Sequence, residues 1–88
     1  MSNFIGKISY DISTDITIIG FIIRKHWKNN TRIYIAKDNN NNIITFHSNV
    51  AFPINQTWNI NGKIKRHHIF NEQKQTHISD WHLELCLN

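Results

Sequence analysis

The sequence predicts a small all-β barrel of five strands with little or no helix. Apolar and polar residues alternate along most of the chain, and the alternating stretches are rich in isoleucine, threonine and aromatic residues. Asn, Asp and Gly separate these stretches, and no window carries the apolar stripe of a three-turn helix. A chain of 88 residues forms one domain, spanning residues 1–88. Five antiparallel strands avoid exposed edges best by closing, which favours a Greek-key barrel over a sandwich.

The expected strands lie near residues 4–10, 15–26, 31–37, 43–48, 57–69 and 77–87. Alternatively, the first two form one long bent strand broken at residues 11–14. Turns are expected at 27–30 and 38–42, where asparagine tolerates a positive φ. The connection 49–56 holds the only proline, Pro53, and at most one helical turn. Glycines inside expected strands mark bulges or bends that help the sheet to close: Gly6, Gly20 and Gly62.

The direction of each side chain follows from the period of two. In the stretch 57–69, Trp58, Ile60 and Ile64 are expected to face the core. In the last strand, the row of His77, Ser79, Trp81, Leu83, Leu85 and Leu87 is expected to face inward, and the row of Ile78, Asp80, His82, Glu84 and Cys86 outward. Phe4 and Phe52 are also expected in the core.

The run Lys65-Arg66-His67-His68 continues the strand that begins at Trp58. If Ile64 points inward, Arg66 and His68 fall on the same inward row. Burying an unpaired arginine costs several kcal/mol, so the strand is expected to leave the barrel by residue 66. The sequence therefore predicts a basic finger in solvent, with its tip at 71–76 and Lys74 adding charge.

Charge is concentrated in the middle of the chain. The net charge is +4, and eight of the ten Lys and Arg residues lie between Asp15 and Glu72, with Asp38 as the only acid among them. A basic central region of this kind is typical of a protein with an anionic partner.

The order of these segments resembles an OB-fold. The resemblance is carried by a long glycine-bent opening (IGKISYDISTDITIIGFII), two strands joined by a short turn (TRIYIAK, IITFHS), a connection with AFPINQ, the strand WNINGKIKRHHIF and the closing HISDWHLEL. It covers nearly the whole chain, although no helix is expected between the third and fourth strands. Gly62, His67 and Gln73 also give a fainter resemblance to the OB module of RecD-like helicases.

The resemblance implies single-stranded nucleic-acid binding across the second and third strands and the loops beside them. These loops correspond to residues 25–32 and 65–74. Cations would contact phosphates and rings would stack on bases, with Tyr34 on the open face beside Arg32, and Ile33 and Ile35 facing inward. Either Phe46 or His47 completes the platform. The candidate residues are Arg24, Lys25, Trp27, Lys28, Arg32, Tyr34, Phe46, His47, Lys63, Lys65, Arg66, His67 and Lys74.

Several other classes of protein are not expected. Six scattered acids and the absence of a nucleophile–base pattern argue against an enzyme. The six histidines show no metal-ligand spacing, so no metal and no cofactor are predicted. Cys86 is the only cysteine, which rules out an intramolecular disulfide. No secretory signal or apolar run of membrane length is seen, so a cytoplasmic protein that does not enter membranes is expected.

The sequence thus predicts a non-catalytic module for single-stranded nucleic acid, with DNA favoured over RNA and weak sequence preference. It would serve a larger assembly, such as a replication, repair or mobile-element protein, or act as a homo-oligomer. The alternative is a protein–protein interaction module that uses the same barrel and Trp27.

Overall fold

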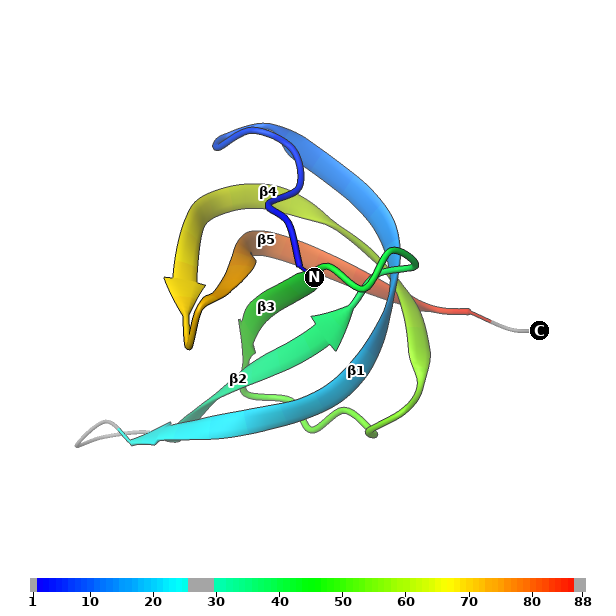
Figure 1. Ribbon diagram of the computed structural model, residues 1–88. Helices are drawn as coiled ribbons and strands as arrows, with labels where there is room; N and C mark the ends of the chain where they lie inside the picture. Colours follow the sequence, from blue (N-terminus) through cyan, green and yellow to red (C-terminus); the bar gives the residue numbers. More distant parts are fainter. Residues whose placement is uncertain (1, 26–29, 87–88) are drawn as a thin grey trace.

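Five strands and no helix make up the part of the chain that the structure describes. The computed structural model describes residues 2–25 and 30–86. Its strands are β1 (Asp11–Lys25), β2 (Asn30–Lys37), β3 (Ile43–Ser48), β4 (Thr57–Phe70) and β5 (Gln73–Leu85) (Figure 1). The all-β prediction is confirmed. A helix long and apolar enough to cross a membrane is not found among these residues.

The five strands form one sheet that closes on itself. β1 pairs with β2 and β4, β2 with β3, and β4 with β5, all antiparallel. The circuit is completed by a parallel pairing of residues 43–46 of β3 with residues 75–78 of β5. The result is a closed barrel with the strand order β1-β2-β3-β5-β4. Within the closed part of the sheet every strand has two neighbours, so no strand edge is free there.

Side chains from all five strands fill the barrel. The buried core cluster consists of Ile16, Ile18, Tyr34, Ala36, Ile44, Phe46, Ile60 and Ile78. Phe52, Trp58 and Trp81 pack against it, as expected, and the Trp81 indole Nε1 donates to the His47 carbonyl at 2.8 Å. Phe4 is not in the core, because its ring stacks on His67 at 4.6 Å.

Bulges bend the long strands, two of them at the predicted glycines. The β1–β2 register shifts between Ile18 and Gly20, and the β4–β5 register shifts between Asn61 and Lys63. At Gly62 the opposing strand comes so close that a Cβ atom would lie 2.9 Å from the Ser79 carbonyl oxygen. A side chain there would force β4 and β5 apart, so only glycine fits this bend.

The first expected strand, residues 4–10, is not a strand. The left-handed backbone of Gly6 and Ser9, with φ of 62° and 74°, interrupts any extended conformation. The segment 2–10 instead crosses the barrel and ends with a backbone hydrogen bond from Ser9 N to Ile64 O. The break expected at 11–14 is also absent, because these residues belong to β1 and pair with β4.

The last strand changes face at a bulge, which the simple alternation missed. Asp80 has a φ of 50°, and two residues of β5 lie between the pairs Ser79–Lys63 and His82–Asn61. As a result, Ile78 points into the core together with Trp81 and Leu83. The prediction that Ile78 faces water was wrong, since a strict period of two does not survive an inserted residue.

Candidate functional site

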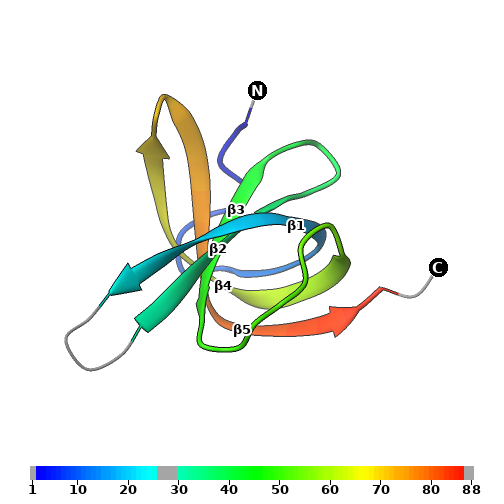
Figure 2. The same cartoon turned by 90° about the horizontal axis from the view of Figure 1, so that it is seen from below.

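A groove lies between two strand pairs that extend beyond the barrel. The outer ends of β1 and β2 form one pair and the β4–β5 hairpin forms the other, with β2 and β3 between them (Figures 1 and 2). The groove has a volume of about 400 Å³. Residues from all five strands line it: Ile22, Arg24, Ile33, Ile35, Thr45, His47, Arg66, His68, Phe70, Gln75 and His77.

Strand β2 turns toward the groove the side that was expected to face the core. Tyr34 is only 1% exposed, and its hydroxyl donates to the Val50 carbonyl and accepts from the Phe52 amide. Ile33 and Ile35 therefore face the groove. The prediction of an exposed Tyr34 was wrong, because Tyr34 and Phe46 stack within the core at 5.4 Å.

The sequence left open whether Phe46 or His47 faces the binding surface. The β2–β3 register decides this, because it pairs Phe46 with the buried Tyr34 and His47 with Ile33. Phe46 is fully buried, whereas His47 lines the groove. Of the rings considered for the platform, Tyr34, Phe46 and His47, only His47 lies at the open face of the described structure.

Polar side chains form the floor of the groove. The Thr45 hydroxyl and His77 Nδ1 are hydrogen-bonded at 2.8 Å, and His68 Nε2 and Gln75 Oε1 are 3.0 Å apart. His77 is 3% exposed and Gln75 7%. Burial lowers the pKa of His77 from 6.5 to about 4, and the nearby charges of His47 and Arg66 act in the same direction. His77 is consequently uncharged at neutral pH.

The rim of the groove is cationic. Arg24 on β1 and Arg66 on β4 line it from the two extended pairs, and both are exposed. Lys65 is also exposed, beside Arg66 at the register shift between Ile64 and Arg66. Aspartate and glutamate are absent from the described lining residues. Such a surface attracts anions and does not attract cations.

The β4–β5 hairpin projects as expected, but its faces are not both in solvent. Its turn consists only of Asn71 and Glu72, which have φ of 50° and 63°, as a tight two-residue hairpin turn requires. Gln75 and Thr76, expected at the tip, are buried in β5. One face of the hairpin thus forms a wall of the groove.

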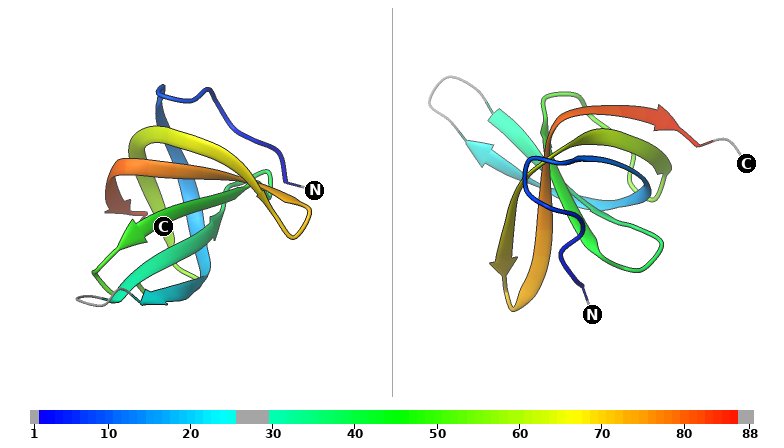
Figure 3. Two further views of the ribbon diagram at one scale, coloured as in Figure 1. Left: turned by 90° about the vertical axis from the view of Figure 1, so that its left-hand side faces the viewer. Right: turned by 90° about the horizontal axis from the view of Figure 1, so that it is seen from above.

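The segment 2–10 supports the other face of the hairpin (Figure 3). His67 Nε2 lies 3.2 Å from the Ile5 carbonyl oxygen, and the Ile5 amide donates to the Thr76 hydroxyl. The ammonium group of Lys74 lies over the Phe4 ring. His67 and Lys74 are therefore directed away from the groove, and sequence reasoning alone placed them in it.

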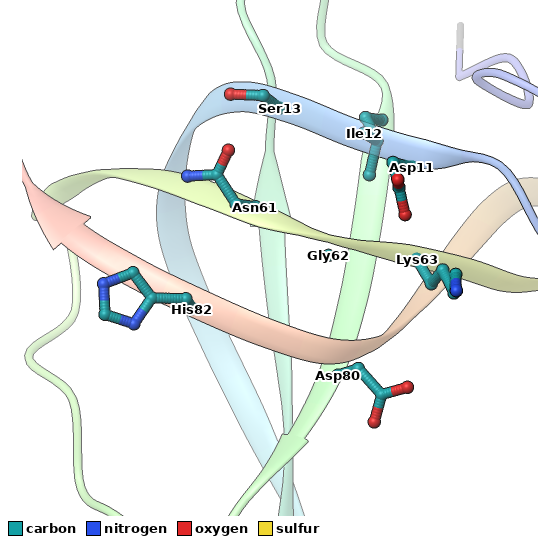
Figure 4. Close-up of a pocket in the computed structure, with 8 residues that line it drawn as sticks. All are labelled: Asp11, Ile12, Ser13, Asn61, Gly62, Lys63, Asp80 and His82. Atoms are coloured by element: carbon teal, nitrogen blue, oxygen red, sulfur yellow. The ribbon is translucent and has the colours of Figure 1, made fainter.

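Lys63 lies in a separate outer depression formed by β1, β4 and β5. Its lining residues are Asp11, Ile12, Ser13, Asn61, Gly62, Lys63, Asp80 and His82 (Figure 4). Two carboxylates accompany the single lysine there, so this surface does not favour an anion. The structure does not bring Lys63 to the groove.

The remaining candidates are on the β1–β2 extension. The Arg32 guanidinium lies over the Phe21 ring at 5.3 Å, on the face opposite the groove, and Lys25 is exposed at the end of β1. Trp27 and Lys28 lie outside the described residues. Of the thirteen candidates, the groove lining contains Arg24, His47 and Arg66.

Sequence reasoning missed most of the lining. His68 and Phe70 were within the predicted finger, and they follow Arg66 at intervals of two residues, which gave a usable signal. No sequence signal identified Thr45, Gln75 and His77 as its floor, because the parallel β3–β5 pairing brings them together. Groups of three or more His, Cys, Asp or Glu side chains suited to a metal ion do not occur in the described part of the chain.

Comparison with known proteins gives no match: no family model, no curated protein and no solved structure is significantly similar to this chain.

Proposed function

We propose that the barrel is an OB-fold and that its groove binds single-stranded nucleic acid without catalysing a reaction. The supporting feature of the fold is its strand order, in which β5 is inserted between β3 and β4 of a five-stranded barrel. OB-folds bind oligonucleotides on the face of the second and third strands and in the flanking loops. The groove occupies the corresponding position.

The observation that carries the proposal is the composition of the groove. Its described lining combines two arginines with Phe70, three histidines and three isoleucines, and contains no acid. Single strands are bound by cations that contact phosphates and by rings on which bases stack, with roughly 1–3 kcal/mol per stacked base. Phe70 is 56% exposed and is therefore accessible to a base.

The recessed floor of the groove also favours a single strand. Its walls are two strand pairs of one small domain, and its floor is lined by buried residues such as Thr45 and His77. A flexible single strand can lower its bases into such a recess, whereas the bases of a duplex remain stacked and paired. The expectation that DNA is favoured over RNA stays a prediction.

Fluorescence anisotropy with labelled oligo-dT, oligo-U and a duplex, each at two salt concentrations, tests the proposal. We expect the single strands to bind more tightly than the duplex, with an affinity that falls steeply as salt rises. Binding that is independent of salt, or equal for duplex and single strand, would contradict it.

A protein-docking function is the second candidate, because large apolar side chains are exposed on both extensions. They are Phe21, Ile22, Ile23, Ile69 and Phe70. Contiguous exposed apolar residues often mark a protein interface. This candidate predicts a stable complex whose affinity changes little with salt, and no measurable affinity for oligonucleotides.

A further inference from the structure

Charge and hydrogen-bonding capacity are separated by depth in the groove. The guanidinium groups of Arg24 and Arg66 are on the exposed rim, on opposite sides of the groove. Below them lie Thr45, Gln75 and His77, each less than a tenth exposed. A nucleotide has the same division, since its phosphate is anionic and its base offers neutral donors and acceptors.

The floor has hydrogen-bonding capacity that the described residues do not use. Because His68 Nε2 lies against Gln75 Oε1, Nδ1 is the ring nitrogen left for a ligand. Nδ1 is shielded from water and has no hydrogen-bond partner within the described part of the chain. Unpaired buried polar atoms are uncommon and costly, so a ligand group that hydrogen-bonds to this ring nitrogen gains free energy.

The walls suit one flat ring. Ile33 and Ile35 come from β2 and Phe70 from the β4–β5 hairpin, and all three border the same recess. The groove volume of about 400 Å³ lies near the lower end of the range for small-molecule pockets, about 300–1,000 Å³. A recess of this size accommodates one nucleotide more readily than a run of stacked bases.

We infer that the groove takes up one unstacked base of a single strand and discriminates between bases through Gln75, His68 and His77. This inference rests on the proposed function and extends it. Contacts to phosphates carry no sequence information, whereas hydrogen bonds to the edge of a base do. The protein therefore prefers one base at one position, although backbone charge supplies most of its affinity.

An oligonucleotide with a single base isolates this contribution. We would measure binding of a strand of about ten abasic residues, comparable to the site size of an OB-fold, with A, C, G, T or U at one central position. All versions carry the same phosphates. We expect affinities that differ by about tenfold or more between the best and worst base, the effect of one good pair of hydrogen bonds.

Gln75→Met is the test variant, because it keeps the length of the side chain and removes its polar atoms. We expect it to reduce the differences between bases to less than about threefold while the salt dependence stays unchanged. Lys63→Gln, in the outer depression, is the matched control and should leave the preference intact. His68→Phe tests the same floor if Gln75→Met does not melt cooperatively.

The outcomes separate the two proposals. Equal affinity for all bases, with salt-dependent binding of ordinary single strands, overturns base discrimination and leaves the proposed function standing. A preference that survives both Gln75→Met and His68→Phe shows that the floor does not read the base, and also overturns the inference. If no single strand binds at all, the proposed function fails together with it.

Discussion

The groove and the outer depression are two hollows on one barrel that share strands β1, β4 and β5 but differ in charge. The depression places Lys63 beside Asp11 and Asp80, whereas the described lining of the groove has Arg24 and Arg66 and no acid. Both surfaces contain cations, so counting Lys and Arg along the sequence does not distinguish them. The difference teaches that an anion site needs the absence of carboxylates as much as the presence of cations.

The largest expected effect is a loss of stability when Tyr34, a core residue of β2, is truncated. Tyr34→Ala removes a ring packed against Phe46 and Phe52 and two hydrogen bonds of its hydroxyl. Loss of a buried aromatic side chain costs about 3–5 kcal/mol, so we expect unfolding or a large decrease in melting temperature. Thermal and urea denaturation measure this. A stable Tyr34→Ala variant that has lost only nucleic-acid binding would contradict the buried position.

The second expected effect is a pH dependence of the protein's stability that is caused by His77 in the floor of the groove. The pKa of His77 is about 4 in the folded protein and 6.5 in the unfolded chain. Above pH 6.5 the residue is neutral in both states and carries no penalty. As the pH falls from 6.5 to 4, the unfolded chain takes up the proton first, and the free energy of unfolding decreases by at most about 3 kcal/mol.

Urea denaturation of the wild type and His77→Gln across this pH range measures that decrease. Other titrating groups are common to both proteins, so their contributions largely cancel in the difference. We expect the wild type to lose more stability than the variant. Parallel pH profiles would show that His77 is not held neutral by the fold.

A third effect sharpens the contrast between the faces of the β4–β5 hairpin. Phe70 lines the groove, whereas its neighbour Ile69 is 64% exposed and absent from the lining. Phe70→Ala should weaken binding of oligo-dT by about fivefold to a hundredfold, the contribution of one stacked base. Ile69→Ala is the control in anisotropy titrations. An equal loss for both variants would indicate a general hydrophobic tip instead of a stacking face.

The smallest effect tests the comparison of the two hollows directly. Arg66→Gln should weaken oligo-dT binding by about threefold to tenfold and reduce the salt slope by about 0.7. Lys63→Gln should change neither, because its lysine lies among carboxylates. Titrations at several salt concentrations measure both quantities. If the Lys63 variant loses as much as the Arg66 variant, the electrostatic distinction between the hollows is wrong.

The accuracy with which the sequence predicted position and facing differs between strands. Alternation located β3 and most of β4 because apolar and polar residues alternate along them and turn residues precede β3 and follow β4. β2 was assigned the wrong face, since Ile33 and Ile35 on one side are as apolar as Tyr34 and Ala36 on the other. The register shift at Asp80 and the left-handed backbone at Ser9 could not be predicted from the sequence either. Neither aspartate nor serine requires a positive φ.

The candidate site shows the same division. The basic run of β4 led to Arg66 and to a projecting hairpin, and the cations around the expected loop 25–32 led to Arg24. The floor was missed because Thr45 and His77 are 32 positions apart and meet only across the parallel pairing of β3 with β5.

By itself, the sequence determined the all-β class and the basic character of the central region. These properties depend on local alternation and composition, which each short stretch carries on its own. Only the tertiary structure decided which face of β2 is buried, which cations share a hollow with carboxylates, and which polar residues form a neutral floor. Closure of the barrel fixes those relations, because it sets the partners and register of every strand at once.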